Sequence, residues 1–340
     1  MIKIVVDGFG GDGAPFEVVK GIVEAININS DIHIVVTGKE DILKGEFAKY
    51  KYNPEQVTIL NADEVITNDD VPTSAIRTKR NSSLVVAFDY ARVNDDCVGL
   101  ISAGSTGAVL TGAFMKLGRL KGIYRPALCP ILPTITGGMT GICDSGANMD
   151  CKPEYIGQFA LMGSAYLKTL GVENPRVALL NVGTEEHKGD AKTKECFDIL
   201  KGLGDKINFV GNMEGRDVMS GDYDLVVTDG FAGNVLLKST EGACKILLKT
   251  LKTEIKAGFF SKIGALFMSR AFRNVKNKMD YNKYGGAVLL GCKKLLVKGH
   301  GSSKAGSIAS CINQVYRMNE GKLIENISSE LSALGLEENE

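Results

Sequence analysis

The sequence has no excess of either charge, since its 340 residues contain 40 lysines and arginines and 40 aspartates and glutamates. This balance excludes a generally basic nucleic-acid binder, although a basic face can still exist locally, so we expect no nucleic-acid partner. The chain also lacks an uninterrupted apolar stretch of about 20 residues and a basic, apolar leader. These absences predict a cytoplasmic protein without membrane-spanning helices.

Two kinds of reactive-site pattern are missing as well. None of the eight cysteines belongs to a C-x-x-C pair or has a neighbouring histidine. We therefore expect buried thiols in a reduced compartment, with neither a disulfide framework nor a metal site. The chain has no G-x-S-x-G turn and no Ser/His/Asp spacing, which argues against an activated-serine hydrolase. No pattern in the sequence calls for a cofactor.

What the chain does contain is an alternation of short apolar runs and amphipathic segments. Such an alternation predicts an α/β fold, a largely parallel sheet covered by helices on both faces, within one domain over residues 1–340. The expected strands are Ile2–Val6, Ile32–Val36, Val57–Leu60, Val98–Ser102, Ala127–Leu132, Met139–Asp144, Val177–Val182, Ile207–Val210 and Leu225–Thr228. Helices are expected to start near Pro15, Ser82, Gly104, Pro153, Asp190 and Phe231.

The segment DGFGGDGAP at residues 7–15 matches the G-x-G-x-x-G pattern of dinucleotide sites. Such a site also needs an acidic residue at the end of the second strand, where this chain has Thr37. Asp7 and Asp12 would moreover repel a pyrophosphate. The segment therefore predicts a glycine-rich turn that opens a helix, with acids that position hydrogen-bonded groups.

Five polar, glycine-rich segments follow predicted strands. They are SAGSTGA at 102–108, DSGANMDCKPE at 144–154, NVGTEEHKGD at 181–190, GNMEGRD at 211–217 and TDGFAGNVLLKSTEG at 228–242. Each alone also fits an ordinary polar turn or helix cap, although the hydroxyls and helix-start N–H groups of the first suit an anion such as phosphate. Because the carboxyl ends of parallel strands meet at one edge of a sheet, the five together predict a site for a long, anion-rich ligand.

Residues 245–280 are basic and apolar at the same time. Apolar bulk gathers at Phe259, Phe260, Ile263, Leu266 and Phe267, and only Glu254 and Asp280 oppose nine basic residues, Lys245, Lys249, Lys252, Lys256, Lys262, Arg270, Arg273, Lys276 and Lys278. This pattern predicts a protruding helical hairpin over residues 240–282 whose tip contacts an anionic membrane surface or an acidic partner. A dimer interface or a core helix pair with solvated lysines fits the same pattern.

In this order, the motifs resemble those of the bacterial phosphate acyltransferase family of phospholipid synthesis. Further matching blocks are KLGRLKGIYRPAL and PILPT within residues 116–134, YGGAVLLG at 284–291 and HGSS at 300–303. The resemblance runs from residue 3 to about residue 318, and departs from the family where Gly8 and Ser105 replace the usual alanine and asparagine.

The resemblance implies a three-layer αβα sandwich similar to the phosphotransacetylases and the isocitrate and isopropylmalate dehydrogenases, as a homodimer. It implies transfer of a long-chain acyl group from acyl-acyl-carrier protein to inorganic phosphate. The acyl phosphate would then pass to a membrane glycerol-3-phosphate acyltransferase, with this chain bound peripherally to the inner face of the cell membrane. A short-chain acyl-coenzyme A phosphate acyltransferase and a non-catalytic lipid-synthesis scaffold are the alternatives.

Phosphate is itself a competent nucleophile toward a thioester, so the enzyme only has to hold the two reactants and stabilise the tetrahedral oxyanion. Lys188 and His300 are the candidates for protonating the leaving thiolate, although a solvated lysine and a structural histidine fit the sequence too. The other candidate phosphate- and substrate-binding residues are Gly10, Gly11, Asp12, Ser102, Ser105, Thr106, Arg125, Asp144, Asn148, Asn181, Glu185, Asn212, Asp229, Asn234 and Lys238.

Overall fold

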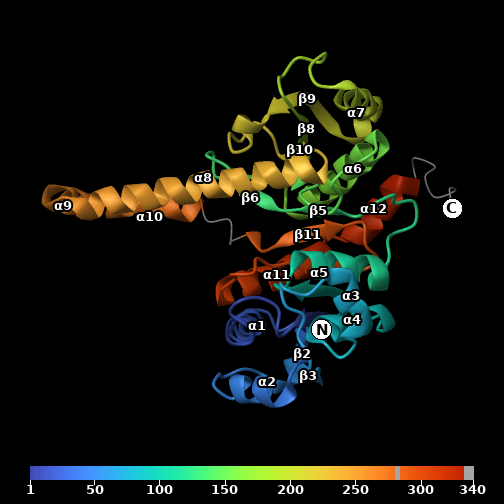
Figure 1. Ribbon diagram of the computed structural model, residues 1–340, viewed down its shortest axis with the longest axis vertical. Helices are drawn as coiled ribbons and strands as arrows, with labels where there is room; N and C mark the ends of the chain where they lie inside the picture. Colours follow the sequence, from blue (N-terminus) through green and yellow to red (C-terminus); the bar gives the residue numbers. More distant parts are fainter. Residues whose placement is uncertain (280–283, 333–340) are drawn as a thin grey trace. The chain divides into compact units, whose positions relative to one another are not determined.

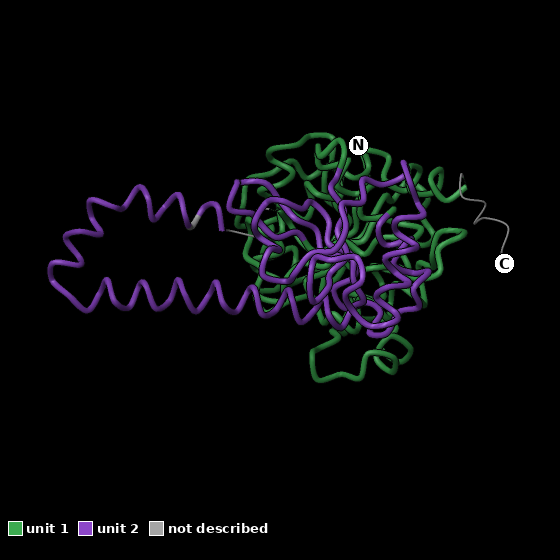
Figure 2. Tube along the Cα trace, turned by 90° about the horizontal axis from the view of Figure 1, so that it is seen from above, with its two compact units in different colours: residues 1–130, 161–174, 282–340 green, residues 131–160, 175–281 purple. Residues whose placement is uncertain are grey.

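A computed structural model describes residues 1–279 and 284–332 of the chain. These residues divide into two compact units, coloured separately in Figure 2. Unit 1 lies within residues 1–130, 161–174 and 282–340, and unit 2 lies within residues 131–160 and 175–281. That both act as a single catalytic domain stays a prediction.

Unit 1 contains a seven-stranded sheet in the order β3-β2-β1-β4-β12-β11-β5. Its strands are β1 (Ile2–Asp7), β2 (Ile32–Gly38), β3 (Val57–Asn61), β4 (Cys97–Ser102), β5 (Ala127–Cys129), β11 (Ala287–Leu290) and β12 (Leu295–Lys298). Strands β3 to β12 in that order pair in parallel, whereas β11 pairs antiparallel with both β12 and β5. The buried valines and isoleucines of β1 and β2 fit a sheet that helices cover on both faces.

Helices cover both faces of this sheet (Figure 1). They are α1 (Phe16–Ile28), α2 (Glu40–Phe47), α3 (Pro72–Thr78), α4 (Ser83–Val93), α5 (Thr106–Gly112), α11 (Ala305–Glu320), α12 (Leu323–Ser332) and the second half of α6 (Pro153–Thr169), with short turns η1 (Pro54–Gln56) and η2 (Ala113–Leu117). Helices α1 and α11 approach closely at Gly21, where a Cβ atom would lie 2.6 Å from the Ala305 carbonyl oxygen. Glycine is therefore required at this contact.

Unit 2 contains a five-stranded sheet in the order β6-β7-β10-β8-β9, in which only β6 runs antiparallel to its neighbour. The strands are β6 (Ile131–Pro133), β7 (Met139–Cys143), β8 (Arg176–Asn181), β9 (Asn208–Glu214) and β10 (Leu225–Val227). Ile142, Ala178 and Val226 form the centre of its core, with Leu237 from a helix. The helices of this unit are the first half of α6, α7 (Ala191–Gly202), α8 (Gly230–Ala257), α9 (Phe259–Phe267) and α10 (Ser269–Lys278), besides the turns η3 (Gly204–Lys206) and η4 (Gly215–Asp217).

Helix α8 extends away from the sheet of unit 2, α9 lies at its far end, and α10 runs back toward the sheet (Figures 1 and 2). These three helices, which we call the hairpin, occupy the region where the sequence predicts one. Residues 280–282 and the side chain of Lys276 lie outside the described residues. Among the helices that the structure describes, none combines the length and the apolar composition needed to cross a membrane.

The expected single sheet is wrong, because the chain forms two sheets. The predicted strand Ala127–Leu132 breaks at Pro130, which has no N–H to donate, and its halves pair in different sheets. Of the five polar segments, the one at 102–108 follows a strand of unit 1 and the other four belong to unit 2, so they do not share one sheet edge. The segment at 211–217 also begins inside β9 instead of after it.

Candidate functional site

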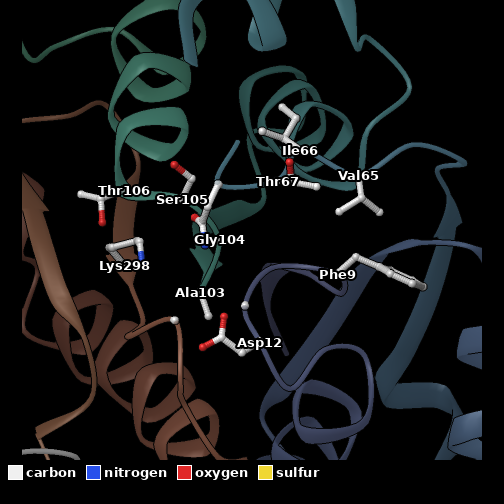
Figure 3. A pocket seen from close by; sticks show the side chains of 13 residues that line it. Phe9, Asp12, Val65, Ile66, Thr67, Ala103, Gly104, Ser105, Thr106 and Lys298 are labelled. Carbon is white, nitrogen blue, oxygen red and sulfur yellow. The ribbon is translucent and has the colours of Figure 1, made fainter. Parts of the chain in front are cut away.

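Unit 1 contains a cavity of about 370 Å³ at the carboxyl ends of β1, β4 and β12 (Figure 3). Its lining residues are Phe9, Gly11, Asp12, Val65, Ile66, Thr67, Asn68, Ala103, Gly104, Ser105, Thr106, Lys298 and Gly301. Small-molecule sites usually enclose about 300–1,000 Å³, so this cavity has room for more than one small anion. Its position agrees with the rule that ligands bind at the carboxyl ends of parallel strands.

A hydrogen-bond chain behind the cavity joins the ends of β1 and β4. Ser102 Oγ donates to Asp7 Oδ2 at 2.7 Å and accepts from the Gly104 N–H at 3.0 Å. Burial raises the pKa of Asp7, while the hydrogen bond from Ser102 and the charge of Lys298 act in the opposite direction. A Cβ atom on Gly10 would lie only 2.6 Å from Asp7 Oδ2, so glycine lets the two loops meet here.

Lys298 is a cavity residue that was not predicted from the sequence. It is the last residue of β12, stands beside Ser102 in the strand register and is only 8% exposed. Its ammonium donates to the Gly299 carbonyl oxygen, and the following loop is held by the Asp12 N–H, which donates to the Gly301 carbonyl oxygen at 2.8 Å. A single lysine that ends the buried run LLV was the available signal in the sequence.

The wall formed by residues 65–68 is fixed by an ion pair. Lys79 Nζ lies 2.7 Å from Asp70 Oδ2 and donates to the Val65 carbonyl oxygen at 3.1 Å. Asp70 Oδ2 also accepts from the Thr67 N–H at 2.8 Å. The apolar side chains of Val65 and Ile66, together with Phe9, thereby form a wall that is distinct from the polar side with Ser105, Thr106 and Lys298 (Figure 3).

The predicted site residues of unit 1 divide into those that line the cavity and those that do not. Gly11, Asp12, Ser105 and Thr106 line it. Gly10 and Ser102 lie behind it, in the contact between the two loops. Neither His300 nor Arg125 belongs to the lining, and both are exposed. His300 Nδ1 lies 2.9 Å from Ser302 Oγ.

In unit 2, Asp144 holds the loop that follows β7. Its buried carboxylate accepts from the N–H groups of Gly146, Ala147 and Asn148 at 3.2, 3.1 and 2.6 Å. It also accepts from the Asn148 side-chain amide at 3.0 Å, and the Asn148 carbonyl oxygen accepts from the Gly230 N–H at 2.7 Å. These bonds tie the loop to itself and to the start of α8.

Asp229 and Asn234 make hydrogen bonds in the same region of unit 2. Asp229 Oδ1 caps α8 by accepting from the Ala232 N–H at 2.8 Å, and Lys192 Nζ lies 3.4 Å from Asp229 Oδ2. The Asn234 side-chain amide donates to the Ser145 carbonyl oxygen at 3.0 Å. Both predicted residues therefore make bonds that position the backbone.

Four further candidates lie in or against the loop after β8: Asn181 at the end of the strand, Glu185 and Lys188 in the loop, and Asn212 in β9. Asn181 Nδ2 donates to the Lys188 carbonyl oxygen at 3.2 Å, and Asn212 Nδ2 donates to the Glu185 carbonyl oxygen at 2.9 Å. The side chains of Lys188 and Glu185 are exposed, with 4.0 Å between Nζ and Oε1. Lys188 thus keeps an accessible ammonium, whereas the two asparagines hold the loop.

Lys238 lies on α8 outside these loops, and its Nζ is 2.8 Å from Glu241 Oε2. Farther along the hairpin, the predicted contact residues are all exposed. The exposed fractions are 73% for Phe259, 84% for Phe260, 43% for Ile263, 79% for Leu266 and 85% for Phe267. Within the described residues, no group of three or more histidine, cysteine, aspartate or glutamate side chains is placed to hold a metal ion.

Known proteins match this chain over nearly its whole length. A family model described as a fatty acid synthesis protein matches residues 2–326. A phosphate acyltransferase of Clostridium perfringens (strain SM101) is 46% identical over 97% of both chains, and one of Clostridium acetobutylicum is 46% identical over 97% of this chain and 99% of its own.

Solved structures bear on the fold. A phosphotransacetylase from Streptococcus pyogenes covers 95% of this chain and 94% of its own, with 16% identity and a TM-score of 0.63. A 4-hydroxythreonine-4-phosphate dehydrogenase from Klebsiella pneumoniae covers 93% of this chain and 98% of its own, with 14% identity and a TM-score of 0.51. The α/β fold class expected from the sequence is confirmed.

Proposed function

This chain belongs to the fatty acid synthesis protein family and is a phosphate acyltransferase, and from that premise we propose that it transfers a long-chain fatty acyl group from acyl-acyl-carrier protein to inorganic phosphate. The cavity of unit 1 is the observation that carries the proposal. It combines the hydroxyls of Ser105 and Thr106 with an apolar wall at Val65 and Ile66. A phosphate fits the polar side, and the thioester end of an acyl chain fits the apolar side.

The chemistry is a single acyl transfer without oxidation or reduction. An oxygen of phosphate attacks the thioester carbonyl carbon, the tetrahedral oxyanion collapses, the C–S bond breaks and the new C–O–P linkage remains. The thiolate of the carrier's pantetheine arm leaves and takes up one proton. Lys188 and His300 are the proposed donors of that proton, since both side chains are exposed.

Within unit 1, the phosphate is proposed to bind among Ser102, Ser105 and Thr106. Asn148, Lys188, Asn181 and Asn234 of unit 2 are separate candidates for substrate contact. Ser105 and Thr106 have the strongest support, because they line the cavity. Asp12, Asp144 and Asp229 are proposed to orient donors; Asp144 and Asp229 already accept from backbone N–H groups. The product would pass to a membrane glycerol-3-phosphate acyltransferase.

The experiment that tests this function uses purified protein, palmitoyl-acyl-carrier protein and radiolabelled phosphate. We expect a labelled lipid that hydroxylamine converts to the hydroxamate, with one free thiol released per product. Ser105→Ala combined with Thr106→Val should lower the yield, whereas Ser261→Ala on α9 should not. Acyl phosphate from acetyl-coenzyme A alone would replace the proposal by the short-chain reaction, and turnover of neither donor would favour a non-catalytic scaffold.

We further propose that the hairpin holds a homodimer of this enzyme against the inner face of the cell membrane. Phe259, Phe260, Leu266 and Phe267 expose most of their surface at the far end of the hairpin, and Lys262 and Arg270 lie close by in the sequence. Aromatic side chains beside basic ones are typical of segments that bind the headgroup region of anionic lipids. The acidic carrier protein and the dimer contact are the competing uses of the same surface.

Vesicle flotation separates these uses. Replacing Phe259 and Phe260 by glutamate should abolish binding to phosphatidylglycerol vesicles and leave turnover of soluble substrate within about twofold. Phe16→Glu, which changes a 57% exposed phenylalanine of α1, is the matched control. Retained flotation contradicts membrane contact; a loss of carrier-protein affinity or of the dimer in sedimentation would assign the surface to that partner.

A further inference from the structure

Lys298 places a positive charge inside the protein at the edge of the unit 1 cavity. Its side chain is only 8% exposed, yet it is one of the residues that line the cavity. Lysine is almost never this deeply buried unless a group of opposite charge or several hydrogen-bond acceptors stabilise it. The surroundings of Lys298 therefore indicate what the charge is for.

Three adjacent parallel strands end at this point. Lys298 ends β12, Ser102 ends β4 beside it in the register, and Asp7 ends β1. Ser102 Oγ connects to Asp7 Oδ2 at 2.7 Å, and the charge of Lys298 favours the ionised form of Asp7. Asp7 is 2% exposed and does not line the cavity, so its carboxyl lies on the protein side of this cluster.

The cavity side of Lys298 carries hydroxyl groups. Figure 3 shows Lys298 on the same side as Ser105 and Thr106, whereas Asp12, the other charged lining residue, lies apart from them near Ala103. A buried ammonium beside two hydroxyls suits a compact oxyanion, because charge-assisted hydrogen bonds are strongest where water is excluded. Phosphate, as free anion or as the phosphodiester of a pantetheine arm, has this chemistry.

We propose that Lys298 is the cation that binds the inorganic phosphate substrate, next to the hydroxyls of Ser105 and Thr106. This inference rests on the proposed function and adds a catalytic residue to it. Lys298 keeps its proton throughout: it holds the attacking phosphate by charge, and the proton taken up by the leaving thiolate comes from another group. The positive charge of Lys298 also offsets part of the negative charge that the attacking phosphate shares with the tetrahedral oxyanion.

The test compares Lys298→Met with Lys293→Met, the same change at an exposed lysine of the preceding turn. Binding of inorganic phosphate alone is measured by calorimetry, and KM is measured separately for phosphate and for acyl-acyl-carrier protein. Loss of a charged hydrogen bond corresponds to a factor of about 10–100. We therefore expect Lys298→Met to weaken phosphate binding and raise the phosphate KM by about that factor, with the KM of the acyl donor within about twofold and the Lys293 variant unchanged.

Lys298→Arg provides a second test of phosphate binding if the methionine variant does not fold. It keeps the charge that faces Asp7 but moves the donor atoms, so phosphate affinity should fall without being lost. Wild-type phosphate affinity in either folded variant overturns the proposal, since a purely structural lysine would leave phosphate binding untouched. Unchanged phosphate affinity with weaker binding of phosphopantetheine overturns it too, and assigns the charge to the carrier's phosphodiester.

The two proposals fail in different ways. If the wild type binds phosphate through Lys298 but forms no acyl phosphate from acyl-acyl-carrier protein, the proposed function is wrong and the phosphate site stands. If the wild type forms acyl phosphate and Lys298→Met does so with an unchanged phosphate KM, the function stands and the role of Lys298 is wrong.

Discussion

Asp7 in unit 1 and Asp144 in unit 2 both stand at the carboxyl end of a parallel strand, and both are buried. Asp7 accepts a hydroxyl from the neighbouring strand at Ser102, and the glycine loop beside it contributes Gly11 and Asp12 to a cavity. Asp144 instead accepts three backbone N–H groups of its own loop and the amide of Asn148. Similar motifs thus form part of a cavity wall in unit 1 and a self-supporting turn in unit 2.

Among the substitutions that test this difference between the two aspartates, Asp144→Ala should have the largest effect on stability. Four donors would lose their acceptor in a half-buried loop, and an unsatisfied donor that stays buried costs about 1–3 kcal/mol. We expect the free energy of unfolding to fall by roughly 3 kcal/mol or more, measured by urea denaturation. Asp198→Ala, at an exposed position of α7, should stay within about 0.5 kcal/mol, and an equally small loss for Asp144→Ala would show that the loop does not depend on this carboxylate.

Gly10→Ala tests the corresponding contact of unit 1. The new Cβ would lie 2.6 Å from Asp7 Oδ2 and 2.7 Å from the Gly104 nitrogen, so the two loops would have to separate. We expect about 1–3 kcal/mol of destabilisation and a marked loss of phosphate binding by calorimetry. Gly45→Ala, where no atom lies within 4 Å of the added Cβ, should stabilise α2 by up to about 1 kcal/mol and leave binding intact. Normal phosphate binding by Gly10→Ala would separate this contact from the cavity.

Acid should affect the two units with opposite signs. Burial alone would raise the pKa of Asp224. Hydrogen bonds and charge from Arg176, whose Nε lies 2.9 Å from Asp224 Oδ2, outweigh burial and hold this pKa below its ordinary value. This contribution is fully present above the ordinary pKa of about 4 and is lost as the pH falls through the folded-state value. Asp7, whose pKa is raised by burial, contributes in the opposite sense, with stability that is lost as the pH rises.

The consequence for Asp224→Asn is a pH-dependent loss of stability. We expect it to lower the free energy of unfolding by about 1–2 kcal/mol at pH 7, and the difference from wild type to shrink as the pH falls below about 4. Urea denaturation at several pH values measures this difference. A difference that is constant with pH would mean that the carboxylate charge of Asp224 contributes nothing.

Lys188→Ala should have the smallest effect on stability. The side chain is exposed and its ion-pair distance to Glu185 is 4.0 Å, so we expect a change within about 0.5 kcal/mol. Turnover should nevertheless fall by about tenfold or more if Lys188 contacts phosphate or protonates the thiolate. Steady-state kinetics beside Lys194→Ala, an exposed lysine of α7, measures this effect. Full activity of Lys188→Ala would remove Lys188 from the proposed machinery.

Local sequence patterns were sufficient to place the strands whose apolar runs are long. Strands β1, β2 and β4 lie within two residues of their predicted ends, because continuous valine and isoleucine runs are typical of buried parallel strands. Strands β11 and β12 were missed, since each has only four residues and periodicity over four residues does not separate a strand from a helix. The break at Pro130 follows from its missing N–H, but which sheet each half joins is decided by tertiary packing.

The same limit applies to the candidate site. Ser105 and Thr106 were predicted from a strand–turn–helix motif that lies within one short segment of the chain, and both line the cavity. Lys298 was missed because only the pairing of β12 with β4 brings it beside Ser102. No local pattern shows that pairing, as it joins residues 97–102 to residues 295–298.

The position of β12 in the sheet has a consequence for the chain while it is being made. The residues of strands β1 to β4 are all present once about the first hundred residues have been made. Strand β4 then has an open parallel edge until β12 is synthesised. In the same way, β5 lacks its neighbour in the sheet until β11 is synthesised. An exposed strand edge pairs readily with other chains. We therefore expect the open edge of β4 to be prone to pairing with other chains during synthesis, and the cavity of unit 1 to form only once β12 has been added.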